Sequence, residues 1–511
     1  MASHDRPSLT ATSSILLFRQ LVSLPANGLA LGVTSHLLGP SDFAAQAWMV
    51  PVASLAFAGA DLGTSQALLL RSDVPGAGLL RRLQVVKAVA GLVVFAALLF
   101  GSRWLRSAFA LPRTWTLLFG FCAVVGWLQS QRSLRAVALQ RIVRVDRIAL
   151  IELLEILVGN AILTAVAYLT RSPWCFAASL AGRMLFGAIL LSPSYTRMRK
   201  DAASAAPLQS AAAELQPLLR HGIPLQAVNL LGMANGLATA VIVTRIASTS
   251  VLGVVQWANS VAAVPFSILP PFYAFLFALF ASRYRLGTGN SEAAIVCSQA
   301  ATAVCAFGGS VLLACYEPLV GALFTSKWLG AERIVALLIA ANVIGVPLSI
   351  LGSYLSSSGH CRAWLATNIV GTGGIVAIAP ALTRYLGGVG YALGWATATA
   401  ISILWLTFMF RRLLRVRLSA MPFLGYTGMM LASAYVGRSC GGVTDVFLLD
   451  VLLRSVATAA CFASGAALLH TTAMRTEWPT LRCNAVSAVS GFRSSFSARR
   501  LFAFASRGGG V

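Results

Sequence analysis

Apolar runs of about 20 residues recur along almost the whole chain, and a helix of that length crosses the hydrocarbon core of a bilayer. The chain has 511 residues, of which 58% are hydrophobic and only 11% are charged. So few charged residues could not cover the core of a soluble protein of this size. Alternating segments of about ten residues, which would indicate membrane-spanning strands, are absent. We therefore predict an all-α polytopic membrane protein with about 14 transmembrane helices.

Each predicted span coincides with one apolar run. The third and thirteenth runs are short, which leaves twelve or thirteen spans as alternatives. The predicted spans lie near residues 14–38, 45–70, 85–100, 116–133, 149–169, 174–195, 222–244, 251–282, 293–315, 331–356, 364–383, 387–410, 421–437 and 446–470.

The basic residues predict the orientation of the chain. There are 39 Lys and Arg residues against 15 Asp and Glu, a formal net charge of +24. In a soluble domain this excess would suggest a nucleic-acid partner. Here most basic residues lie in the connections on one side of the predicted spans, as expected for cytoplasmic loops. We therefore predict an even number of spans, both termini in the cytoplasm, and no nucleic-acid partner.

Connection lengths suggest how the spans are grouped. The longest connection between two spans, residues 197–221, is basic at its start and rich in alanine. We interpret it as a cytoplasmic linker with an interfacial helix, and an ordinary long loop is the alternative. It would separate an N-terminal six-helix lobe (1–196) from a C-terminal six-helix lobe (222–410). Two extra transmembrane helices (411–474) and a basic, disordered cytoplasmic tail (475–511) would follow.

A short repeat supports this division. The first span contains Ala26–Ala30 and the seventh contains Ala234–Ala238, and both segments read Ala-Asn-Gly-Leu-Ala. The spans that follow them contain Gln46–Trp48 and Gln256–Trp257 at nearly the same distance. Chance is the alternative explanation, since matches are common in helices rich in small residues. Because six spans separate the copies, the pattern predicts parallel repeats about an axis along the membrane normal.

No motif in the sequence indicates catalysis or a cofactor. The phosphate-binding G-x-x-x-x-G-K-[ST] motif, the metalloprotease H-E-x-x-H motif and the G-x-S-x-G nucleophile motif are all absent. The nine cysteines form no C-x-x-C, and the five histidines have no metal-ligand spacing. We therefore predict no catalytic residues, no metal site and no cofactor. A membrane polysaccharide polymerase or ligase is the enzyme alternative, but such enzymes carry a large outer loop, and the predicted outer loops are short.

Several motifs resemble a known family. They are Arg19–Leu21 in the first span, Leu37–Phe43 in the outer loop, Ala60–Gly63 at the end of the second span, and Ser358–Arg362 in an inner loop. Their order is similar to that in bacterial polysaccharide or O-antigen flippases of the multidrug/oligosaccharidyl-lipid/polysaccharide exporter superfamily. Two features depart from the usual pattern. Ala44–Ala45 stands where members often have a glycine, and the basic tail is atypical.

The resemblance implies two six-helix lobes around a central cavity, with alternating access and no covalent chemistry. It implies a polyprenyl-diphosphate-linked oligosaccharide as substrate, transported across a bacterial inner membrane for O-antigen or exopolysaccharide synthesis. Membrane lipids, a polysaccharide polymerase and export machinery would be the partners. A drug/cation antiporter and a lipid II flippase of the same superfamily are the alternatives. The antiporters commonly have twelve spans and buried acids, whereas the lipid II flippase differs mainly in substrate.

Five charged residues within the predicted spans are candidates for the substrate site or for ion coupling, because a charge there costs about 2.5–3.5 kcal/mol on insertion scales. Arg19 and Arg183 are the candidate ligands of the diphosphate, because a guanidinium binds phosphate oxygens in pairs. The alternatives are that Arg19 reaches the headgroups and that Arg183 forms a structural ion pair. Asp61, which we group with the substrate site, is expected to pair with one of these arginines. Glu152 and Glu155 would take part in ion coupling or pair with the basic loop beside them.

Three further charges have predicted local roles. Lys87 and Arg454 lie near the ends of predicted spans, where their long side chains would reach the headgroup region. Asp450 stands four residues before Arg454, a spacing that favours an ion pair on one helix face.

Overall fold

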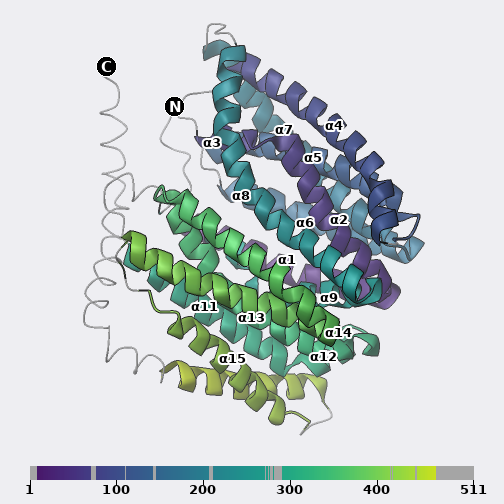
Figure 1. The fold of residues 1–511 in the computed structure, drawn as a ribbon, viewed down its shortest axis with the longest axis vertical. Coiled ribbons are helices and arrows are strands. Elements are labelled where there is room, and N and C mark those ends of the chain that lie inside the picture. The colour runs from purple at the N-terminus through teal and green to yellow at the C-terminus, as the bar shows by residue number, and fades with distance from the viewer. Residues whose placement is uncertain are drawn as a thin grey trace. The chain divides into compact units, whose positions relative to one another are not determined.

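The computed structural model consists of helices joined by short connections (Figure 1). No strand occurs among the residues that the structure describes, and the predicted tail (475–511) lies outside them. The described residues are 9–70, 76–109, 111–141, 145–205, 211–270, 272–273, 276, 280, 291–414, 416, 418–442 and 446–467.

The first half of the chain forms long helices at the positions of the predicted spans. The second predicted span is divided, because Leu62 (φ 51°) and Gly63 (φ 70°) adopt left-handed backbone conformations that end α2. A left-handed residue directs the chain out of the helix, so α3 begins as a separate element. The helices are α1 (Leu9–Leu37), α2 (Pro40–Asp61), α3 (Thr64–Leu70), α4 (Ala77–Phe109), α5 (Trp115–Arg141), α6 (Val145–Thr170) and α7 (Trp174–Ala205).

The second half of the chain also consists mostly of long helices, and in one of them two predicted spans are joined. The 54-residue α14 contains a non-helical residue, Gly387 (φ 58°, ψ −134°), at a kink where two helices join. A straight helix of that length would extend about 80 Å, far beyond a bilayer, so the kink separates the predicted eleventh and twelfth spans. The elements are α8 (Ala211–Ile246), α9 (Thr249–Ala262), η2 (Val264–Phe266), α11 (Ser291–Ala314), α12 (Tyr316–Leu323), η3 (Ser326–Ala331), α13 (Glu332–Ser357), α14 (Cys361–Leu414) and α15 (Met421–Ser439), followed by a helix at Phe447–Ala467.

These helices confirm the predicted fold class. Among the described residues, eight helices are long and apolar enough to cross a membrane, and the kinked α14 counts as one of them. The predicted linker (197–221) is helical in its described residues, because α7 continues to Ala205 and α8 begins at Ala211. The role of this segment as a linker and the lobe boundaries on either side of it stay a prediction.

The chain forms two compact units. The described residues of the first unit lie within 1–268, 319–341 and 365–401, and those of the second lie within 269–318, 342–364 and 402–511. In the first unit, α1 packs on α6, α2 on α5 and α9, and α7 on both α5 and α6. These contacts place the helices that carry Arg19, the two glutamates and Arg183 next to one another.

The predicted repeat has a counterpart inside the first unit. Trp48 on α2 donates a hydrogen bond from Nε1 to Thr244 Oγ1 on α8 (3.2 Å), and Trp257 on α9 donates one to Ser35 Oγ on α1 (2.9 Å). Ser35 and Thr244 are separated by the same number of residues as Trp48 and Trp257. In the register of the five-residue repeat, Ser35 corresponds to Val243, which is next to Thr244. Positions that are equivalent to within one residue therefore exchange reciprocal bonds, as expected for an approximate twofold relation between the copies.

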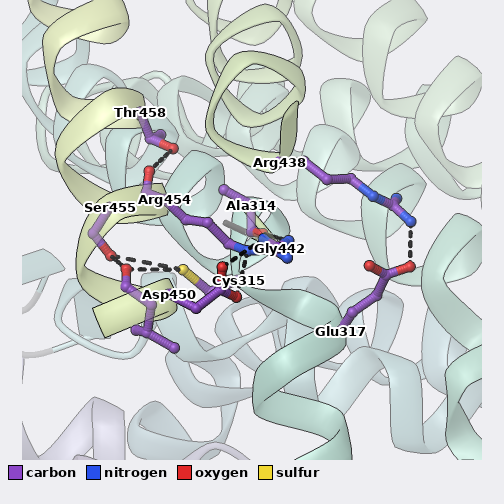
Figure 2. A network of polar contacts seen from close by, with 10 residues as sticks. Ala314, Cys315, Glu317, Arg438, Gly442, Asp450, Arg454, Ser455 and Thr458 are labelled. Atoms are coloured by element: carbon purple, nitrogen blue, oxygen red, sulfur yellow. Dashed lines mark hydrogen bonds and ion pairs between the residues drawn. The ribbon is translucent and has the colours of Figure 1, made fainter. Parts of the chain in front are cut away.

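A polar network in the second unit joins the helix 447–467 to α11 (Figure 2). Arg454 Nε donates to Asp450 Oδ2 at 2.9 Å, which confirms the predicted pair. Arg454 Nη1 also donates to the Ala314 carbonyl at 3.1 Å, at the C-terminus of α11 where carbonyls lack helical partners. Arg454 is buried, so the prediction that it extends to the headgroups is wrong. Arg438 forms a further ion pair with Glu317 in the same region.

Candidate functional site

Five charged side chains gather inside the first unit. Arg19 comes from α1, Arg132 from α5, Glu152 and Glu155 from α6, and Arg183 from α7. The two glutamates lie three residues apart and so share one face of α6. Because α6 packs against α1 and α7, and α7 also packs against α5, this face meets the three arginines. We call these five residues the arginine–glutamate cluster.

Glu155 is held by a two-bond contact with one arginine. It accepts two hydrogen bonds from Arg132, from Nε to Oε1 at 2.6 Å and from Nη2 to Oε2 at 2.8 Å. Its side chain is 1% exposed. The sequence makes room for it, because a Cβ added at Gly187 on α7 would overlap the carboxylate. This paired geometry is the strongest form of arginine–carboxylate contact.

Glu152 is held more loosely. Its Oε2 lies 3.2 Å from Arg19 Nη2, and its Oε1 lies 3.6 Å from Arg132 Nη2. The second distance is too long for a hydrogen bond. The Glu152 side chain is 30% exposed, against 1% for Glu155. Glu152 thus bridges two arginines without a paired contact to either.

Arg183 is the member of the cluster that has no counter-ion of its own among the described residues. Its Nε is buried and has no hydrogen-bond partner. The charges of Glu155, Arg132, Glu152 and Arg19 all act on it. Its aliphatic stem passes Gly159 of α6, where an added Cβ would lie 3.4 Å from the Arg183 Cβ. The glycine therefore lets α6 and α7 pack closely around the guanidinium.

The cluster keeps an excess of positive charge. Three guanidinium groups face two carboxylates, and Arg19 Nε is also buried without a partner. Unpaired buried donors are costly, so such groups require an explanation. An anion with several oxygens supplies acceptors for such donors and offsets the excess positive charge.

Asp61 lies outside this cluster. It pairs with Lys87 of α4, and the two side chains are 2% and 0% exposed. Ser65 Oγ donates to Asp61 Oδ1 at 2.6 Å, and Lys87 Nζ also donates to Ser65 Oγ (2.8 Å) and the Ser130 carbonyl (3.3 Å). The predicted pairing of Asp61 with an arginine is therefore wrong, as is the prediction that Lys87 reaches the headgroups. The network holds the break between α2 and α3.

Arg132 was not predicted as a site residue. Because it lies at the very end of the fourth predicted span (116–133), it was counted among the basic residues that mark the cytoplasmic side. In the structure, α5 continues to Arg141 and carries Arg132 into the cluster. The glutamates contact Arg19 and Arg132. Of the basic loop predicted to pair with them, Arg147 forms no ion pair with either glutamate among the described residues, and Arg144 lies outside those residues. The same described residues contain no group of three or more His, Cys, Asp or Glu that could hold a metal ion.

The sequence comparison identifies the family. The family described as polysaccharide biosynthesis protein matches residues 33–333, more than half of the chain. This chain belongs to that family. The match includes four of the five members of the cluster and confirms the resemblance to polysaccharide flippases. No curated protein sequence matches the chain significantly.

Solved structures with the same fold belong to the exporter superfamily. Lipid II flippase MurJ in an inward closed conformation is 13% identical, with a TM-score of 0.66 over 91% of this chain and 99% of MurJ. An inward-facing MATE family multidrug resistance transporter is 15% identical, with a TM-score of 0.59 over 80% of this chain and 99% of the transporter. A Vibrio cholerae MATE transporter is 12% identical, with a TM-score of 0.51 over 79% of this chain and 98% of the transporter. The chain therefore has the fold of the MurJ and MATE proteins.

Proposed function

We propose that this protein moves a polyprenyl-diphosphate-linked oligosaccharide from the inner to the outer leaflet of a bacterial inner membrane. The oligosaccharide is a unit of O-antigen or exopolysaccharide. Transport proceeds by alternating access and breaks no covalent bond, so the protein is not an enzyme. A polysaccharide polymerase and the export machinery take up the product on the outer side.

The excess positive charge of the arginine–glutamate cluster carries this proposal. Charged residues within a membrane cost about 2.5–3.5 kcal/mol each on insertion scales, so a group of five is expected to have a function. Arg19 and Arg183 both keep a buried Nε without a partner. A diphosphate supplies several oxygens in the geometry that guanidinium groups bind in pairs. Arg132 is a third ligand in the same group.

The cluster also weighs against a drug/cation antiporter, the alternative suggested by the fold of the MATE transporters. Such a protein needs buried acids that are free to bind a cation or a proton. Here Glu155 is held by two hydrogen bonds from Arg132, and Glu152 lies between two arginines. The net charge of the group favours an anionic substrate.

Deletion of the gene tests the proposal. The cell should lose its surface polysaccharide and accumulate the lipid-linked precursor in the inner leaflet, because synthesis continues without transport. A wild-type copy of the gene should restore the polysaccharide. If the precursor is never made, the protein is a synthetic enzyme and the proposal is wrong. If peptidoglycan synthesis stops instead, the substrate is lipid II.

A further inference from the structure

The two carboxylates of the arginine–glutamate cluster differ in how they are held. Glu155 makes two short hydrogen bonds to one arginine and is fully buried. Glu152 makes one contact at 3.2 Å and one at 3.6 Å, to two different arginines, and remains 30% exposed. Replacing the contacts of Glu155 would require breaking a paired geometry, whereas the contacts of Glu152 are individually weak. Glu152 is therefore the carboxylate that another anion can replace.

The position of Glu152 is also the position that a diphosphate needs. It bridges Arg19 Nη2 and Arg132 Nη2, which lie on two different helices. A diphosphate has more oxygens and more charge than a carboxylate. It therefore has oxygens for both arginines and further oxygens for unpaired donors nearby. Arg19 Nε and Arg183 Nε are buried and unpaired, and the charge of Glu152 acts on Arg183.

We propose that Glu152 is an exchangeable counter-ion, which occupies the diphosphate subsite and is displaced when the substrate binds. This inference rests on the proposed function. Glu155 stays on Arg132 throughout and keeps that guanidinium in place. When the substrate leaves, the return of Glu152 restores its contacts with the two arginines. The exchange limits the affinity of the protein for its substrate, so that the diphosphate is not held permanently by three partly buried arginines.

If Glu152 competes with the substrate for the arginines, the protein should bind a diphosphate more tightly when the charge of Glu152 is removed. The full-length protein is purified in detergent, and binding of radiolabelled farnesyl diphosphate is measured by scintillation proximity. Glu152→Gln keeps the size of the side chain but no longer competes for the arginines, so its Kd should fall roughly tenfold. That change corresponds to about 1.4 kcal/mol. Glu152→Asp, which keeps the charge but shortens the side chain, should give a smaller decrease and serves if the first variant does not fold.

Two controls accompany this measurement. Glu317→Gln removes a carboxylate that is also paired with an arginine but lies outside the cluster, so it should leave the Kd unchanged. Unlabelled farnesol, which has the same tail and no phosphate, should not compete with the labelled probe. Loss of polysaccharide in a cell that carries Glu152→Gln, despite tighter binding, would be the expected result of slow release.

The outcomes separate this inference from the proposed function. In one outcome the wild type binds the probe, Arg183→Ala weakens that binding, and Glu152→Gln does not tighten it. The exchange of Glu152 is then wrong, whereas the diphosphate site of the proposed function is supported. If farnesol competes as well as unlabelled farnesyl diphosphate and no arginine variant changes the Kd, the proposed function is wrong together with the exchange. Tighter binding by Glu152→Gln and weaker binding by Arg183→Ala support both.

Discussion

Removing the charge of Lys87 gives the sharpest test of the buried network at the break between α2 and α3. Lys87 donates to Asp61, to Ser65 and to the Ser130 carbonyl, and its side chain is fully buried. Lys87→Met keeps the apolar stem and removes all three bonds. Asp61 is then left as a buried charge that keeps the hydrogen bond from Ser65 but has no cation.

The expected cost follows from that unpaired carboxylate. Breaking a buried ion pair by removing one partner destabilises a protein by about 3–5 kcal/mol. The fully buried Asp61–Lys87 pair should lie in this range. Asp61→Asn combined with Lys87→Met removes both charges and retains an acceptor for Ser65, so the double variant should regain most of the stability.

Both variants are compared with the wild type by thermal unfolding in detergent and by surface polysaccharide in cells. Lys87→Met should unfold at a markedly lower temperature, and the double variant should recover both stability and polysaccharide. Because the pair lies outside the arginine–glutamate cluster, transport should follow the amount of folded protein. A double variant with wild-type stability but no polysaccharide would refute this reasoning and give Asp61 the role in substrate binding that the sequence predicted.

Three further predictions follow from the other charges. Arg183→Ala should abolish surface polysaccharide at a normal protein level. Arg183→Lys should retain part of it, because lysine keeps the charge but cannot bind two phosphate oxygens at once. Equal polysaccharide in both variants would contradict a role in diphosphate binding. Arg454→Met should lower the free energy of unfolding by about 3 kcal/mol, because among the described residues Asp450 then keeps only the Gly442 amide as a donor. An unchanged unfolding temperature would show that the network in Figure 2 contributes no stability. Single cysteines at Ser41 and Ser204, in a cysteine-free background, should be labelled from the outside and the inside of the cell respectively, and the opposite result would reverse the topology.

The sequence by itself determined the class of fold, because the length of an apolar run can be read along the chain without knowing which segments lie beside it in space. A segment of about 20 apolar residues has to satisfy its backbone hydrogen bonds internally in a bilayer, so each run becomes a helix whatever its neighbours are. Ion pairs within one helix were also predictable, because the spacing of two residues along the chain sets their distance in a helix. Asp450 and Arg454 are one helical turn apart, and the predicted ion pair is present at 2.9 Å. The kink at Gly387 likewise falls at the first residue of the twelfth predicted span, next to the boundary between two predicted spans.

Only the tertiary structure decided which charges meet. Arg132 contacts glutamates from another helix, and Lys87 contacts an aspartate two elements earlier in the chain. An amphipathic helix reveals its buried face through its polar residues, but a membrane helix is apolar on every side, so its sequence does not mark the face that packs inward. Asp61 was therefore matched to the wrong cation, and Arg132, at the end of a predicted span, was not recognised as a member of the cluster. The packing of α6 against α1 and α7, and of α7 against α5, brought Glu152 and Glu155 to their arginines.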